Sequence, residues 1–133
     1  MTGRPCYKAH MPGFMRSFEP QCYALLRVVT GFLFLWHGSE KLFGYPAAMP
    51  EGVPAVITWT AGPIELVGGA LVMIGLWTRW AAFLCSGLMA FAYWMGHGTK
   101  ALLPVVNHGE LAVIYCFLFL YISARGSGSW SVD

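Results

Sequence analysis

Long apolar stretches separated by short breaks dominate the chain. A helix needs about 20 mostly apolar residues to cross the hydrocarbon core of a bilayer. Glycine and proline mark the first and third breaks, and Thr78-Arg79 makes a tight second connection. The pattern predicts an all-α fold, a four-helix transmembrane bundle. Its spans are expected at residues 22–43, 54–77, 80–97 and 108–124.

The composition supports lipid rather than water as the solvent of this chain. Its 133 residues are 57% hydrophobic and only 11% charged, whereas an average soluble domain is about 25% charged. So few charges cannot cover a soluble domain of this size. The sequence contains no cluster of Lys and Arg of the kind that would indicate a nucleic-acid partner. The four cysteines form no CxxC pair, which excludes a zinc ribbon or a thioredoxin-type motif.

The basic residues predict the orientation of the bundle. Residues 1–21 read as a polar tail with three basic residues and no apolar segment typical of a signal peptide. Arg79 lies between the second and third spans, and Arg125 follows the fourth. Because cytoplasmic loops carry the excess of Lys and Arg, we expect both termini in the cytoplasm. Residues 126–133 read as a short, flexible C-terminal tail.

Several ionisable groups lie inside the predicted spans, where they are costly and mark functional sites. The depth of each group follows from its position along its helix, at a rise of about 1.5 Å per residue. By this estimate the groups lie together in the outer half of the bundle. We therefore expect a polar pocket that opens outward, closed by aromatic residues such as Trp59, Tyr93 and Trp94. The polar members of this cluster are His37, Lys41, Glu65, Glu110, His97 and His108.

Glu65 is the most informative of these groups. It shares a helical face with Gly62 and Gly69, which let a neighbouring helix approach closely, so its carboxylate is aimed at protein. Pro63 predicts a break or kink in the same helix, and broken helices at membrane depth often line binding sites. The alternative is structural: Glu65 pairs with Arg27 and fixes the bundle.

Two other interpretations concern the remaining polar residues. Asn107 and Glu110 stand three apart, a spacing that also fits a helix capping box. The histidines and carboxylates offer metal-ligating atoms, but no HxxxH or ExxH spacing places two of them on one helical turn. We therefore predict no metal site. The chain also carries no haem, flavin or iron–sulfur motif.

Read together, these motifs resemble the DoxX family of small membrane proteins over residues 22–133. The resemblance lies in their order and spacing, and in a Gly-x-Gly-x-x-Ser-x-Asp ending. The matching residues are Leu26-Arg27, Gly31, His37-Gly38, Lys41, Glu65, Gly68-Gly69, Gly75-Leu76, Thr78 to Ala82, Asn107, Gly109-Glu110-Leu111, Gly126, Gly128, Ser131 and Asp133.

The resemblance implies a four-helix bundle in a bacterial cytoplasmic (inner) membrane. Relatives include membrane subunits of thiosulfate:quinone oxidoreductase, and other members are partners of soluble enzymes in thiol or oxidative-stress functions. We therefore expect a quinone-linked oxidoreductase subunit with quinone as cofactor. Membrane lipid and other subunits, or a soluble redox partner that supplies the electrons, would be its partners.

In this reading each site residue has a role. Glu65, His37 and Glu110 handle protons, and the ligand-binding residues are Lys41, Arg27, Asn107, Trp59 and Trp94. Two alternatives stay open from the sequence. One is a non-catalytic accessory or scaffold subunit of a larger membrane complex, and the other is a small transporter or proton pathway.

Overall fold

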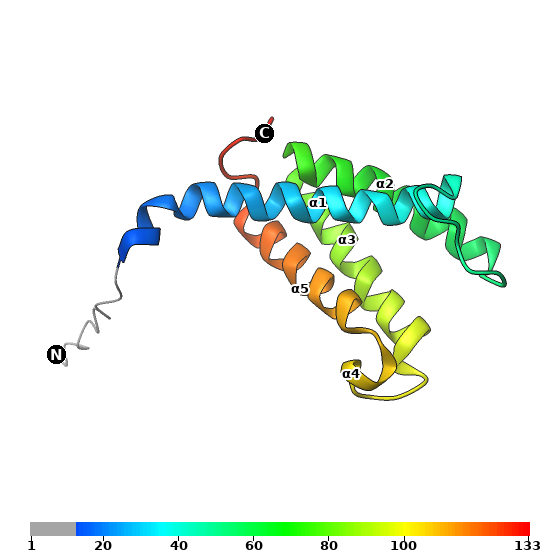
Figure 1. The fold of residues 1–133 in the computed structure, drawn as a ribbon. Helices are drawn as coiled ribbons and strands as arrows, with labels where there is room; N and C mark the ends of the chain where they lie inside the picture. Colours follow the sequence, from blue (N-terminus) through cyan, green and yellow to red (C-terminus); the bar gives the residue numbers. More distant parts are fainter. Residues whose placement is uncertain (1–12) are drawn as a thin grey trace.

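The computed structural model describes residues 13–133, and this range is built from helices and loops without strands. The predicted all-α class is confirmed. Figure 1 shows the helices in chain order. They are the 3-10 turn η1 (Gly13–Phe18), α1 (Glu19–Phe43), α2 (Ala55–Ile74), α3 (Thr78–Tyr93), the π-helical turn η2 (Trp94–Gly98), α4 (Pro104–Asn107) and α5 (Glu110–Arg125).

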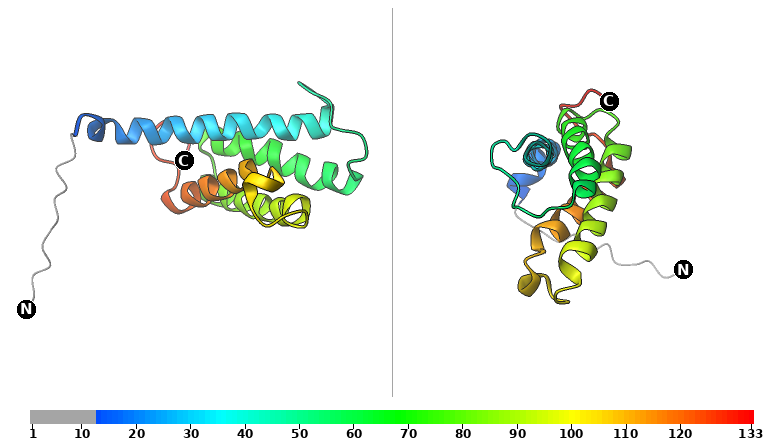
Figure 2. Two further views of the ribbon diagram at one scale, coloured as in Figure 1. Left: turned by 60° about the horizontal axis from the view of Figure 1, so that its bottom comes forward. Right: turned by 90° about the vertical axis from the view of Figure 1, so that its right-hand side faces the viewer.

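The long helices form two antiparallel pairs. α1 packs along α2, and α3 packs along α5, while α2 and α3 join the pairs (Figure 1). α1 and α5 make only sparse contact. Figure 2 shows that the N-terminal part of α1 extends beyond the other helices. The space between the two pairs is therefore the natural place for a pocket.

Glycines set the distance between α1 and α2. A Cβ atom on Gly31 would lie 2.5 Å from the backbone nitrogen of Met73, and one on Gly69 would lie 2.7 Å from that of Leu35. Gly38 is likewise in contact with the backbone of α2. Small residues let helix backbones approach in this way, and the resulting van der Waals contact stabilises the pair.

α2 is continuous through Pro63, so of the predicted break or kink the break does not occur. Proline removes the hydrogen bond to the carbonyl of Trp59, but the helix still runs unbroken from Ala55 to Ile74. Gly62 and Gly69 bring α2 against α1 around the proline. This packing compensates for one lost bond, because neighbouring helices make proline tolerable in a helix interior.

The outer surface of the helices is apolar. Among residues 13–133, α2 alone is long and apolar enough to qualify as a membrane span by itself; its best 18-residue window has a mean hydropathy of 1.5. Large apolar side chains are nonetheless exposed on every long helix, such as Val29, Val67, Phe83 and Ile114. Soluble monomers rarely expose such extensive apolar surface.

The tail at the C-terminus is held against the bundle, so the predicted flexible tail is wrong. Val132 donates a hydrogen bond to the Ile74 carbonyl (3.2 Å), and Asp133 donates one to the Gly75 carbonyl (2.9 Å). The Asp133 carboxylate accepts bonds from the backbone N–H groups of Trp77 (2.8 Å) and Thr78 (3.0 Å). A helix start leaves such N–H groups unpaired, and sequence periodicity does not reveal that a distant tail returns to them.

The predicted N-terminal tail is also partly helical. η1 and the start of α1 lie inside the range 1–21 that was expected to be a tail. Residues 1–12 lie outside the described part of the chain. Pro20 stands in the first turn of α1, where the missing N–H costs no helix bond.

The cap formed by Asp133 predicts a pH-dependent stability. Hydrogen bonds from the backbone N–H groups of Thr78 and Trp77 hold the pKa of the Asp133 carboxyl below its usual value. Because the pKa is lower in the folded state, the charged carboxylate stabilises the fold. This stabilisation is complete at pH values above the ordinary carboxyl pKa of ~3.9, and it is lost as the pH falls through the lowered pKa. We expect Asp133→Asn to melt at a lower temperature than wild type at pH 7, with the difference shrinking below pH ~3.9.

The control for this prediction is Glu51→Gln, which removes an exposed carboxylate from the α1–α2 loop. It should leave the melting temperature unchanged at both pH values. A difference between wild type and Asp133→Asn that persists unchanged at pH ~3 would contradict a role for the charge of Asp133.

Candidate functional site

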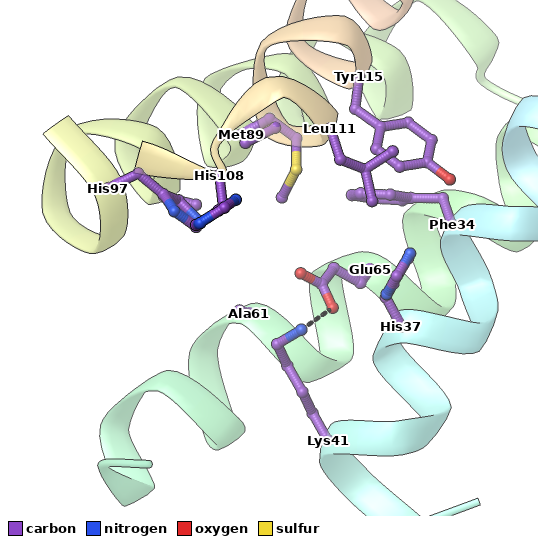
Figure 3. Close-up of a pocket in the computed structure, with 12 residues that line it drawn as sticks. Phe34, His37, Lys41, Ala61, Glu65, Met89, His97, His108, Leu111 and Tyr115 are labelled. Atoms are coloured by element: carbon purple, nitrogen blue, oxygen red, sulfur yellow. Dashed lines mark hydrogen bonds and ion pairs between the residues drawn. The ribbon is translucent and has the colours of Figure 1, made fainter. Parts of the chain in front are cut away.

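A cavity of about 350 Å³ lies between the two helix pairs. We call it the central pocket. Figure 3 shows its charged and imidazole side chains facing one another from different helices. α1 contributes Phe34, His37 and Lys41, α2 contributes Ala61 and Glu65, α3 contributes Met89 and Ala92, η2 contributes His97, and His108, Leu111, Ala112 and Tyr115 come from the start of α5 and the residues before it.

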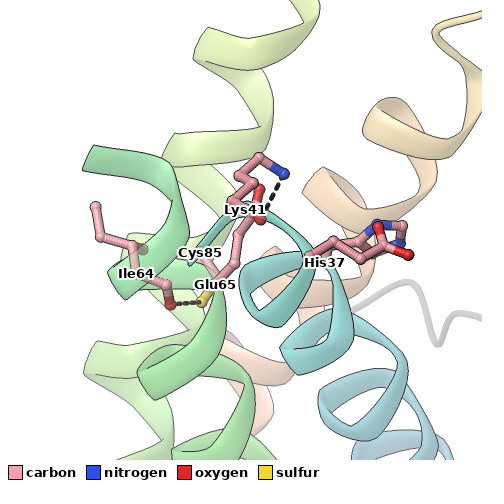
Figure 4. A network of polar contacts seen from close by, with 6 residues as sticks. His37, Lys41, Ile64, Glu65 and Cys85 are labelled. Carbon is pink, nitrogen blue, oxygen red and sulfur yellow. Dashed lines mark hydrogen bonds and ion pairs between the residues drawn. The ribbon is translucent and has the colours of Figure 1, made fainter. Parts of the chain in front are cut away.

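An ion pair forms one side of the central pocket. The Lys41 Nζ lies 2.7 Å from Glu65 Oε2, and their side chains are 15% and 4% exposed. Glu65 therefore pairs with Lys41 on the neighbouring helix, and the predicted structural pair with Arg27 does not form. A charge this deep is tolerable only when it is paired. Figure 4 shows the Lys41–Glu65 contact. His37 also lines the pocket, with its Nδ1 3.7 Å from the Glu40 carboxylate.

His97 and His108 form the opposite side (Figure 3). The His97 Nδ1 lies 3.0 Å from the carbonyl oxygen of Asn107. Because a carbonyl only accepts hydrogen bonds, this contact is a hydrogen bond when Nδ1 carries a proton. His97 sits in η2, a π-helical turn of the kind that often occurs at functional sites. The two sides together present an ammonium, a carboxylate and three imidazoles.

Asn107 is buried and holds the loop that carries these histidines. Its Nδ2 donates to the Tyr93 hydroxyl (3.1 Å) and to the Ala101 carbonyl (2.8 Å). Its Oδ1 accepts from the backbone N–H of Gly109 (2.8 Å). The predicted capping box with Glu110 does not form, because α5 begins with Gly109 at its N-cap and has no side-chain cap. Asn107 thus fixes the conformation of the loop beside the pocket, but its own side chain does not line the pocket.

Aromatic rings close the inner end of the central pocket. Phe34 and Tyr115 lie with ring centroids 5.1 Å apart, and Phe34 also packs on Phe119 at 4.6 Å. No hydrogen-bond partner for the Tyr115 hydroxyl occurs among the described residues. The sequence reasoning missed Phe34 and Tyr115. The signal for Phe34 was its place one helical turn before His37 on the same face.

Besides Asn107 and Arg27, three of the predicted site residues lie outside the central pocket. Glu110 is exposed on the surface of α5. Trp59 and Trp94 are 69% and 59% exposed and do not close the pocket. Trp59 precedes Glu65 by six residues, about 240° around the helix, so it cannot share its face. Glu65, His37 and Lys41 are the predicted site residues that the structure brings together.

Arg27 lies at the opposite end of the bundle and holds the C-terminal tail. Its Nη1 donates to the carbonyls of Val72 (2.9 Å) and Met73 (2.8 Å). Its Nη2 donates to the carbonyls of Ser129 (3.1 Å) and Trp130 (2.6 Å). The side chain is completely buried. It therefore ties the end of α2 to the tail, and it does not reach the central pocket.

The architecture places the chain in a class: small helical proteins with an apolar outer surface and a charged pocket between two helix hairpins. The chain belongs to the DoxX family, whose model matches residues 22–98. It is therefore a DoxX family membrane protein. The match includes Lys41 and Glu65 but ends before His108 and Tyr115.

Two relatives were found among curated proteins. The chain is 38% identical over 125 residues to an "Uncharacterized protein" of Haemophilus influenzae, covering 90% of this chain and 93% of that one. It is 28% identical over 113 residues to the "Putative oxidoreductase CatD" of Bacillus subtilis, covering 82% of each chain. No solved structure matches the chain. The name of the second relative describes that protein as a "Putative oxidoreductase".

Proposed function

We propose that this protein is a quinone-linked redox subunit that spans the membrane four times and binds a quinone ring in the central pocket. The observation that carries the proposal is the Lys41–Glu65 pair, whose 2.7 Å contact borders a cavity instead of being packed within protein. The cavity volume of about 350 Å³ falls in the range of small-molecule sites, about 300–1,000 Å³.

The chemistry of the lining fits a quinone. A quinone ring needs apolar contact on its faces and hydrogen-bond donors at its carbonyl oxygens, and Phe34, Lys41 and the imidazoles offer these. Reduction of a quinone to a quinol takes up two electrons and two protons. Glu65 and His37 are groups that can transfer protons. Two electrons would come from a partner protein, because the sequence carries no motif for a redox centre.

The membrane topology belongs to the same proposal. We infer four crossings, by α1, α2, α3 continued by η2, and α5, in a bacterial inner membrane. Arg79 and Arg125 lie at one end of the bundle, where Arg79 donates to the Arg125 carbonyl at 3.2 Å. This end also holds the C-terminal tail. The positive-inside rule then supports cytoplasmic termini and a central pocket nearer the outer surface.

The alternatives have less support from specific observations. The transporter hypothesis rested on a broken second helix, and α2 is continuous. The accessory-subunit hypothesis needs the Lys41–Glu65 pair to be purely structural. A quinone-binding measurement separates it from the redox proposal, because a structural pair would give a stable protein that binds no quinone.

The test is a titration of the protein, in lipid nanodiscs, with a short-tailed benzoquinone followed by quenching of intrinsic fluorescence. Wild type should bind saturably. The double variant Lys41→Met/Glu65→Gln should bind about 10- to 100-fold more weakly, because a hydrogen bond to a charged group is worth about 1.5–3 kcal/mol. Lys100→Met, which removes an exposed ammonium outside the pocket, is the matched control. Equal affinities for all three proteins, or no saturable binding, would contradict the proposal.

A further inference from the structure

A second cavity opens on the side of the bundle between α1 and α5. This side groove has a volume of about 360 Å³ and is lined almost wholly by aliphatic side chains, including Val29 and Leu33 of α1 and Ile114 and Leu118 of α5. Val29, Leu33 and Ile114 are each 50% or more exposed. The side groove therefore opens onto the apolar outer surface of the protein.

The side groove adjoins the central pocket. Leu111 and Tyr115 line both cavities. The opening exists because the helices pair as α1 with α2 and α3 with α5, which leaves α1 and α5 in sparse contact. The ring of Tyr115, packed on Phe34, stands between the two cavities. A molecule that passed beside Tyr115 would therefore reach from the central pocket to the side of the bundle.

The side chains that line the side groove determine which chemical groups it can hold. Apart from Thr30 and Tyr115, the side groove offers no polar side chain, so it cannot satisfy a charged or hydrogen-bonding group. A hydrocarbon chain meets no such penalty. The central pocket has the opposite character, with an ion pair and imidazoles. The combined shape matches one molecule with a polar head and a long hydrocarbon tail.

We propose that the side groove holds the hydrocarbon tail of the ligand whose ring occupies the central pocket, so that the protein takes a long-tailed, membrane-dissolved quinone sideways from the bilayer. This inference rests on the proposed function and makes it specific, because it excludes water-soluble, tailless substrates as the natural ones. Lipid is as apolar as the groove, so the hydrophobic effect does not drive the tail into it. Binding of the tail therefore depends on its van der Waals contacts with the side chains that line the groove.

The test uses a quinone that carries a photoreactive diazirine on the first part of its tail. After irradiation in nanodiscs, adducts should concentrate on peptides that contain Leu33 and Ile114. Leu33→Trp and Ile114→Trp, which fill the groove from opposite sides, should each lower this labelling severalfold. Leu84→Trp, at an exposed position of α3 that lines neither cavity, should not. Tailless benzoquinone should bind all four proteins equally.

The outcomes separate this inference from the proposed function. If tailless benzoquinone binds but the tail adducts scatter over the outer faces of all helices, the tail does not bind in the side groove. The proposal that the quinone ring binds in the central pocket is then unaffected. If a diazirine-bearing phospholipid labels the groove equally and untagged quinone does not displace it, an ordinary lipid chain occupies the groove and the inference fails. If no quinone binds, both proposals are overturned.

Discussion

Replacing Gly38 with alanine is expected to destabilise the protein by about 3 kcal/mol, the upper end of the cost of overpacking. The added Cβ would meet the backbone nitrogen of Leu66, and would lie 2.7 Å from the Gly62 carbonyl oxygen and 2.8 Å from the Leu66 Cα. Backbone atoms of a packed helix cannot move aside as a side chain can. α1 and α2 must separate, one helical turn from Lys41, so the ion pair should loosen too.

The matched control is Gly87→Ala on α3, where an added Cβ meets no atom within 4 Å. This variant should be equal to wild type or up to about 1 kcal/mol more stable, since alanine favours a helix interior over glycine. Both variants can be measured by unfolding in mixed micelles with increasing sodium dodecyl sulfate. Similar stabilities for Gly38→Ala and Gly87→Ala would contradict the close contact between α1 and α2.

Lys41→Met should cost about 3–5 kcal/mol, because it leaves the Glu65 carboxylate buried without its partner. The Glu65 side chain is only 4% exposed, and Lys41 is the cation that contacts it. Methionine keeps the length and much of the volume of the lysine stem, so the loss reports mainly on the charge. The free energy of unfolding in the same micelles measures it.

The double variant Lys41→Met/Glu65→Gln tests this explanation as a double-mutant cycle. Most of the lost stability should return, because removing both charges leaves no uncompensated ion. Lys100→Met serves as the control, since Lys100 is exposed and has no ion-pair partner among the described residues. The single variant Glu65→Gln completes the cycle. If the losses from Lys41→Met and Glu65→Gln simply add in the double variant, Lys41 and Glu65 do not stabilise each other.

The fold was largely predictable because apolar runs are a strong signal. The four expected spans coincide closely with α1, α2, α3 continued by η2, and α5. Two of the errors came from long-range contacts. Pro63 signals a break locally, but packing on α1 keeps α2 continuous. The tail after Gly126 looks like a linker, but buried Arg27 binds its carbonyls.

The candidate site was predictable in part, for the same physical reasons. Helical rise alone places His37, Lys41 and Glu65 at similar depth, and the structure brings them to one pocket. Depth does not give the direction of a side chain around its helix, and so Trp59 and Glu110 were included wrongly in the pocket. Local spacing also cannot choose between Arg27 and Lys41 as the partner of Glu65, because that choice depends on which helices pack together.

The most direct test of the central claim is photolabelling with a short-tailed quinone that carries an azide on its ring, followed by peptide mapping. A quinone site in the central pocket predicts adducts on residues 37–41 and 108–115, which untagged quinone blocks and the double variant Lys41→Met/Glu65→Gln loses. Adducts confined to the outer faces of the helices, or adducts in the pocket that untagged quinone does not displace, would contradict a quinone site between the two hairpins.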